Sequence, residues 1–260
     1  MLPESKLEEI YVKLHRIIPF SNVEGQGNRC SIFLQGCNIN CLYCHNPETI
    51  PADDEHAKVV SLAYILNEIK KSMPFIRGIT VSGGEPTLHY KKLVPLFIEV
   101  RKLGLTCYLD SNGFFDFEKI KELIEVTDKF LFDIKGVGRG LEHLCFDLKN
   151  VKGEESKNEV EKPSYMSQNI ENLGKLLPLG KIEEVRLVHI KGFYDAYKTV
   201  DAIACVVKDY PEVLFKLIRV HGKGARDEAF ITSKMPSVQE HEALAEYAKG
   251  IGLQHIVVIN

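Results

Sequence analysis

The 260-residue sequence has no apolar run that approaches the length of a membrane span, because charged residues interrupt the apolar stretches after a few positions. It also has no basic block or basic–aromatic stripe: the formal net charge is −3, and residues of both signs are interleaved. We therefore expect no membrane and no nucleic-acid partner, since binding to phosphates needs clustered positive charge. The first residues lack the basic-then-apolar order of a secretory signal, so we expect a cytoplasmic protein.

A fully paired disulfide framework is not expected either, because the chain has seven cysteines, an odd number. Three of them, Cys37, Cys41 and Cys44, lie within eight residues. In a reducing cytosol such a group is more often a metal site than a disulfide. The other four are scattered and are expected to be small buried apolar side chains: Cys30, Cys107, Cys145 and Cys205.

Repeats and low-complexity tracts are absent, so we expect one domain over residues 1–260, in which residues 1–28 form an N-terminal extension and a strand leading into the core. Short β-rich runs alternate with helical patterns, which predicts an α/β fold with a parallel sheet. Six β/α units are too few for a complete eight-fold barrel, so the pattern leaves a partial barrel and a doubly wound sheet open. The expected strands are 30–34, 78–82, 105–109, 130–134, 185–190 and 213–220, with an edge strand at 255–259.

Three amphipathic patterns predict helices between these runs. One covers residues 62–69, and a second covers 117–124 behind a cap at Asp116. A third begins with the capping-box pair Ser237 and Glu240 and ends at Gly250.

Side chains capable of chemistry lie at or just after the ends of successive expected strands, except Arg186, which lies within the fifth. The carboxyl ends of parallel strands meet at one edge of a sheet, where α/β proteins place their active sites. We therefore expect these groups on one rim. In chain order they are the cysteine loop, Gly83-Gly84-Glu85, Asp110-Ser111-Asn112-Gly113, Asp133 with Lys135, Arg186, and His221.

The cysteine loop, Cys37-x-x-x-Cys41-x-x-Cys44, supplies three thiolates. A cubane cluster has four irons, so three cysteines leave one iron open to a small molecule, whereas electron-transfer ferredoxins ligate all four. The competing interpretation is a structural zinc site with His45 or Cys30 as the fourth ligand. Zinc loops usually have a second, distant ligand pair, and the sequence has none. The spacing therefore favours an iron–sulfur cluster.

The remaining groups suit a small polar ligand. Gly83 and Gly84 allow a close backbone approach, and Glu85 can accept hydrogen bonds from an ammonium group. Asp110 and Asp133 could hold a hard cation, bind ribose hydroxyls or cap loops. Lys135 and Arg186 suit a carboxylate, and His221 could contact an adenine or a ribose.

The segment at residues 16–47, RIIPFSNVEGQGNRCSIFLQGCNINCLYCHNP, resembles the radical S-adenosylmethionine (SAM) superfamily. More narrowly, it resembles the glycyl-radical-enzyme activating enzymes, of which pyruvate formate-lyase activase is the best known, and within them the YjjW-type branch. The motifs T-V-S-G-G-E and D-S-N-G extend the likeness, which continues in weaker form to His221.

This resemblance implies a partial (β/α)₆ barrel and one [4Fe–4S] cluster on Cys37, Cys41 and Cys44. It also implies a monovalent cation held by Asp110, Ser111 and Asp133. The residues implied for SAM are Tyr43, Cys44, His45, Gly83, Gly84, Glu85, Ser111, Asp133, Ile134, Lys135, Arg186 and His221.

The implied reaction is reductive cleavage of SAM to a 5′-deoxyadenosyl radical, which takes a hydrogen atom from a glycine Cα of a partner enzyme. No catalytic side chain is needed, since the cluster and SAM supply the chemistry. The implied partners are a glycyl-radical enzyme and a one-electron donor such as flavodoxin or ferredoxin. Two alternatives are a radical SAM enzyme that acts on a small molecule and a non-enzymatic zinc or iron–sulfur interaction module.

The sequence departs from the family pattern in four places. Glu24-Gly25-Gln26-Gly27 stands where the family has D-G-P-G, and Arg219 stands where a histidine is common, so His221 is taken as its substitute. Residues 46–82 contain no cysteine, which predicts a single cluster and no ferredoxin-like insert. Residues 136–163 follow no recognisable pattern of the family.

Overall fold

The computed structural model describes residues 4–137, 144–145 and 165–260. The chain divides into two compact units. The first contains Met1–Asn38, Glu48–Ser111 and Phe115–Leu131, and the second contains Ile39–Pro47, Asn112–Phe114 and Phe132–Asn260. The cysteine loop is thereby divided, with Cys37 in the first unit and Cys41 and Cys44 in the second.

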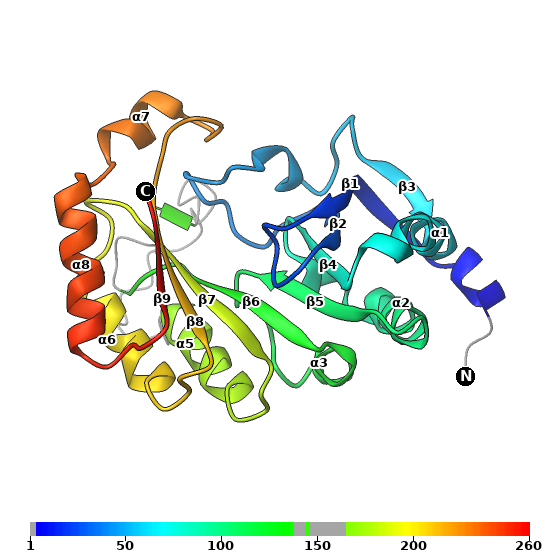
Figure 1. The fold of residues 1–260 in the computed structure, drawn as a ribbon. Helices are drawn as coiled ribbons and strands as arrows, with labels where there is room; N and C mark the ends of the chain where they lie inside the picture. Colours follow the sequence, from blue (N-terminus) through cyan, green and yellow to red (C-terminus); the bar gives the residue numbers. More distant parts are fainter. Residues whose placement is uncertain (1–3, 138–143, 146–164) are drawn as a thin grey trace, which may run out of the picture. The chain divides into compact units, whose positions relative to one another are not determined.

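The first unit is a sheet with the strand order β3-β1-β2-β4-β5 (Figure 1). Its strands are β1 (Tyr11–Ser21), β2 (Arg29–Leu34), β3 (Lys58–Ser61), β4 (Gly78–Gly83) and β5 (Thr106–Ser111). The last three in the order, β2, β4 and β5, are parallel, whereas β1 runs antiparallel to both of its neighbours. Every residue of β2 is buried, as expected for an apolar strand covered on both faces.

Helices and short 3₁₀ turns connect these strands. The helices are α1 (Leu62–Ser72), α2 (Tyr90–Lys102) and α3 (Lys121–Val126). The 3₁₀ turns are η1 (Glu4–Glu8), η2 (Pro47–Thr49), η3 (Met73–Phe75) and η4 (Pro86–His89). The helix that follows β3 begins at Leu62 because Ser61 caps it, its side chain accepting a hydrogen bond from Tyr64 N.

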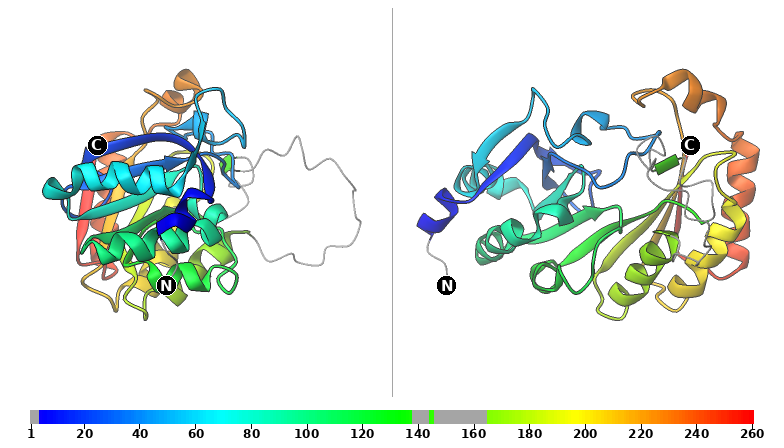
Figure 2. Two further views of the ribbon diagram at one scale, coloured as in Figure 1. Left: turned by 90° about the vertical axis from the view of Figure 1, so that its right-hand side faces the viewer. Right: turned by 180° about the vertical axis from the view of Figure 1, so that it is seen from behind.

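The second unit contains three parallel strands in the order β7-β8-β9, with helices side by side along them (Figures 1 and 2). The strands are β7 (Ile182–His189), β8 (Leu214–Arg219) and β9 (Ile256–Ile259), and β6 (Lys129–Ile134) crosses from the first unit into the second. The helices are α5 (Tyr165–Leu176), α6 (Ala196–Val207), α7 (Glu228–Ser233) and α8 (Val238–Gly250).

These elements confirm the α/β class and the mostly parallel strands that the apolar runs predict, and the run at 255–259 is the edge strand β9. The capping box is also confirmed: Ser237 Oγ accepts from Glu240 N at 3.1 Å, and Ser237 N donates to Glu240 Oε2 at 2.7 Å. Among the described residues, no helix combines the length and apolarity needed to cross a membrane.

Two local predictions are wrong, and one strand pairing was not predicted. Cys205, expected to be a small buried apolar side chain, is exposed in α6. The helix expected at 117–124 begins only at Lys121, because Asp116 Oδ1 accepts from Lys119 N at 3.1 Å and so caps a turn before the helix. The antiparallel pairing of β1 with β3 was not predicted, since β3 has only four residues and charged side chains interrupt the apolar pattern of β1.

Candidate functional site

In the first unit, Cys37 follows β2 directly and is held by its backbone. Gly36 N donates to Thr49 O at 2.8 Å, and Cys37 N donates to Ile50 O at 3.0 Å. The Cys37 side chain is partly exposed and is not in a disulfide. The predicted position of the cysteine loop, at the carboxyl end of this strand, is therefore confirmed.

Gly83 and Gly84 bring the end of β4 against the chain that leads into Cys37. Gly83 has a φ of +114°, and a Cβ atom at this position would lie 2.2 Å from Leu34 O. A Cβ atom on Gly84 would lie 2.0 Å from Gly36 O. The sequence predicted that these glycines allow a close approach to a ligand; the close approach in the structure is to the backbone of residues 34–36.

Glu85 continues this contact and connects two strand ends. Its backbone N donates to Gly36 O at 2.8 Å, and its fully buried carboxylate accepts at Oε1 from Thr87 N (3.0 Å), Thr87 Oγ1 (2.6 Å) and Ser111 Oγ (3.0 Å). Asp110 Oδ2 accepts from Ser82 Oγ at 3.0 Å. The structure thus brings together the predicted acidic and hydroxyl groups at the ends of β4 and β5.

In the second unit, Asp133 pairs with two cations at once. Its Oδ2 accepts from Lys135 Nζ at 2.8 Å, and its Oδ1 accepts from Arg186 Nε at 2.7 Å. Burial opposes the charged form of Lys135, but Asp133 and the neighbouring Tyr43 and Cys41 outweigh it, so the pKa of the ammonium lies above its usual value. Lys135 Nζ also lies 5.6 Å from the centroid of the Tyr43 ring. With two cations against one carboxylate, this group has a net charge of about +1.

This charged group extends to two residues that the sequence did not single out. Glu184, which is 3% exposed, accepts at Oε2 from Lys216 Nζ at 2.7 Å, and its Oε1 lies 3.7 Å from Arg186 Nη1. Burial raises the pKa of the Glu184 carboxyl, which Lys216 partly offsets. Charged residues that alternate with apolar ones in a strand usually face solvent, and that is why the pattern gave no signal.

Cys41 and Cys44 lie in a turn of the second unit, in which Cys44 N donates to Cys41 O at 3.2 Å. Cys41 is buried, and its thiol donates to Cys145 Sγ at 3.4 Å. This contact and burial raise the pKa of the Cys41 thiol, while burial raises the pKa of the Cys44 thiol. Cys145 is buried as predicted, but its position beside Cys41 could not be read from the sequence.

The two histidines expected at the SAM site are neighbours in the second unit. His45 Nε2 and His221 Nδ1 lie 3.3 Å apart, and the ring centroids are separated by 4.4 Å. Burial and the nearby His221 lower the pKa of His45. Ile134, which lies between Asp133 and Lys135 in the sequence, is buried.

Three cysteines on one irregular loop have the chemistry of a donor set for an iron–sulfur cluster. All three loop cysteines are free of disulfides, and the loop between β2 and η2 has no regular structure that would oppose wrapping around a cluster. Within the described residues, no three His, Cys, Asp or Glu side chains converge as ligands of a single ion. Cys30, proposed as a fourth zinc ligand, is fully buried inside β2.

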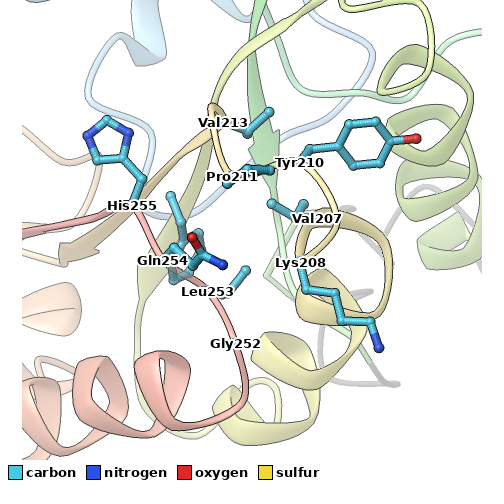
Figure 3. Close-up of a pocket in the computed structure, with 10 residues that line it drawn as sticks. Val207, Lys208, Tyr210, Pro211, Val213, Gly252, Leu253, Gln254 and His255 are labelled. Atoms are coloured by element: carbon cyan, nitrogen blue, oxygen red, sulfur yellow. The ribbon is translucent and has the colours of Figure 1, made fainter.

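Two recesses lie away from these residues, at the amino ends of strands. One, in the first unit, has a volume of about 360 Å³ and is lined by Arg29, Arg77, Thr106 and Tyr108 among others. The other, in the second unit, lies where β8 and β9 begin (Figure 3). Its volume of about 10 Å³ has room for roughly one water molecule, so it holds no substrate.

Residues 23–137 match a family model described as a 4Fe-4S single cluster domain. A relative from Haemophilus influenzae, whose name places it among the glycyl-radical enzyme activating enzymes, is 57% identical over 97% of this chain and 98% of that protein. The chain belongs to the glycyl-radical-enzyme activating enzymes.

A second relative and a solved structure are also similar to this chain. Pyruvate formate-lyase-activating enzyme from Staphylococcus aureus is 37% identical over 48% of this chain and 53% of that protein. The fold is shared with SuiB of Streptococcus suis bound to S-adenosylmethionine, with a TM-score of 0.60 and 14% identity over 86% of this chain and 48% of that one. At this identity the likeness to SuiB shows the fold, while the matched family model describes a 4Fe-4S single cluster domain.

Proposed function

We propose that this activating enzyme holds one [4Fe–4S] cluster on Cys37, Cys41 and Cys44, cleaves SAM reductively, and generates a glycyl radical in a partner enzyme. The observation that carries this proposal is the three-cysteine loop in a chain 57% identical to a member of the family. When bound and reduced, the cluster supplies the electron that breaks the C5′–S bond of SAM, which gives methionine and a 5′-deoxyadenosyl radical.

The role of the first unit is to fix Cys37 and to present hydrogen-bonding groups to the methionyl ammonium. The backbone bonds to Thr49, Ile50 and Glu85 hold the main chain of Gly36 and Cys37 in place. Glu85 and Ser111 are joined by a hydrogen bond, so they present one rigid group rather than two independent side chains. We assign this group, with Gly83 and Gly84, to the methionyl end of SAM.

The role of the second unit is to bind the SAM carboxylate and the nucleoside. Lys135 and Arg186, both oriented by Asp133, are cationic side chains of the type that binds a carboxylate. We assign Tyr43, His45 and His221 to the adenine and ribose. Ile134, also assigned to the SAM site, is buried at the end of β6.

The predicted monovalent cation between Asp110, Ser111 and Asp133 remains a proposal. Both carboxylate oxygens of Asp133 accept hydrogen bonds from cationic side chains, so a cation would have to share at least one of these oxygens. A titration with potassium and sodium salts, followed by SAM affinity, tests this assignment.

The substrate would be a glycyl-radical enzyme, and the electron would come from a flavodoxin or a ferredoxin in the cytoplasm. This partner distinguishes the proposal from the alternative of a small-molecule substrate. The name of the H. influenzae relative supports the protein substrate.

Protein reconstituted without oxygen tests the cluster and the SAM reaction together. We expect about four irons and four sulfides per chain, an EPR signal after reduction, and 5′-deoxyadenosine when SAM is added. Cys41→Ala should lose the iron and the product. Cys205→Ala, which changes an exposed cysteine outside the loop, should keep both. An intact cluster that never cleaves SAM would refute the proposed function, and iron loss in Cys205→Ala would refute the ligand assignment.

A further inference from the structure

Cys145 lies against one of the three assigned cluster ligands. Its Sγ atom is 3.4 Å from Cys41 Sγ, and the two residues are 0% and 6% exposed. Both belong to the second unit, although 104 positions separate them in the chain. Cys145 lies outside the loop and is hydrogen-bonded to a loop cysteine.

Backbone hydrogen bonds hold this sulfur contact in place. Asn40 N donates to Cys145 O at 2.7 Å, and Leu42 N donates to Leu144 O at 2.9 Å. These bonds involve the residues immediately before and after Cys41. The Asn40 side chain accepts a further hydrogen bond from Arg226. The position of Cys145 relative to Cys41 is therefore set by main-chain pairing and not by a side-chain rotamer alone.

Binding to iron fixes the direction of the hydrogen bond between the two sulfurs. A free Cys41 thiol can donate to Cys145, as it does in the structure. A cysteine that ligates a cluster has given up its proton and can only accept. Cys145 is not one of the three ligands, so its S–H group becomes the donor.

We propose that Cys145 donates a hydrogen bond to the cluster-ligating sulfur of Cys41 and thereby raises the reduction potential of the cluster. The inference rests on the proposed cluster ligands. The reduced cluster carries one more negative charge than the oxidised cluster, so a donor to its sulfur stabilises the reduced form more. Cys145 is thus a tuning residue that makes the cluster easier to reduce without being one of its ligands.

The test is an EPR-monitored redox titration of the reconstituted full-length protein without SAM. Cys145→Ala removes the hydrogen-bond donor. At a fixed applied potential near the midpoint of the wild type, we expect the ratio of reduced to oxidised cluster to fall about two- to tenfold. This range corresponds to the net free energy of one hydrogen bond. Cys145→Ser supplies a stronger O–H donor, so its ratio should equal or exceed that of the wild type. Cys107→Ala is the control, because Cys107 is equally buried but its thiol bonds to Phe97 O in the first unit.

Iron and sulfide contents separate this inference from the assignment on which it rests. A wild-type protein without a four-iron cluster would overturn both. A full cluster in every variant, with Cys145→Ala no more shifted than Cys107→Ala, would overturn the tuning role alone. If Cys145→Ala does not retain the cluster, Cys145→Ser decides: a reduced fraction below that of the wild type would overturn the proposal.

Discussion

Gly84→Ala tests the contact that joins the end of β4 to the cysteine loop. The added Cβ atom would lie 2.0 Å from Gly36 O and 2.8 Å from Thr49 O, and both are backbone atoms that no side-chain rotation can move away. An ordinary contact between carbon and oxygen needs well over 3 Å. The strand end and the chain before Cys37 must therefore separate by about 1 Å or more.

The cost of this separation has two parts. Overpacking of a tight contact typically costs about 1–3 kcal/mol. The hydrogen bond from Glu85 N to Gly36 O, 2.8 Å long, would be stretched at the same time, which adds about 0.5–1.5 kcal/mol. We therefore expect Gly84→Ala to lower the free energy of unfolding by about 2–4 kcal/mol.

Urea unfolding of the cluster-free protein under reducing conditions measures this difference. Gly250→Ala is the matched control, because a Cβ atom at the end of α8 meets nothing within 4 Å and its φ is not in the left-handed region. We expect Gly250→Ala to be neutral or slightly stabilising, since alanine is the better helix former. Equal unfolding free energies for the two variants would show that the β4 end does not hold the cysteine loop as described.

Three further predictions concern the second unit. Lys216→Met removes a cationic partner of the buried Glu184 carboxylate and should lower the free energy of unfolding by about 3 kcal/mol. The double variant Lys216→Met with Glu184→Leu should recover much of this loss, as measured by urea unfolding. Burial lowers the pKa of His189 to about 4, so the folded state favours the neutral imidazole. The free energy of unfolding should therefore be highest above about pH 6.5 and fall by about 1–2 kcal/mol as the pH decreases toward about 4. In His189→Gln the free energy of unfolding should depend less on pH over this range. Hydrogen peroxide should oxidise the cluster-free protein to a Cys41–Cys145 disulfide, as the two thiols reduce the peroxide to water. Peptide mapping that finds only other cysteine pairs would contradict the 3.4 Å contact.

The parts of the fold that could be predicted from the sequence are those with a strong local signal. The apolar runs of β2 and β4 are buried on both faces, so they carry no polar alternation and were recognisable as internal parallel strands. The capping box at Ser237 was equally visible, because the bonds that make it join residues three positions apart. The antiparallel pairing of β1 with β3 depends on contacts about 50 residues apart and has no local signature.

The same distinction applies to the site. In the first unit, the positions of Cys37 after β2 and of Gly83 and Ser111 at the ends of β4 and β5 were predictable, since apolar runs mark where these strands end. The contact of Cys41 with Cys145 was not, because it depends on backbone pairing across 104 positions. Glu184 and Lys216 were missed for another reason: each has the residue type of an exposed strand position, and their burial is tolerated because they pair with each other.

Transfer of deuterium from the partner to the product tests the central claim most directly. A glycyl-radical enzyme labelled with deuterium at its glycine Cα atoms is mixed with the reduced activating enzyme and SAM, and the 5′-deoxyadenosine is analysed by mass spectrometry. We predict one deuterium atom in the 5′-deoxyadenosine and a glycyl EPR doublet on the partner. Unlabelled 5′-deoxyadenosine, formed by an enzyme that cleaves SAM with an intact cluster, would contradict hydrogen abstraction from the glycine.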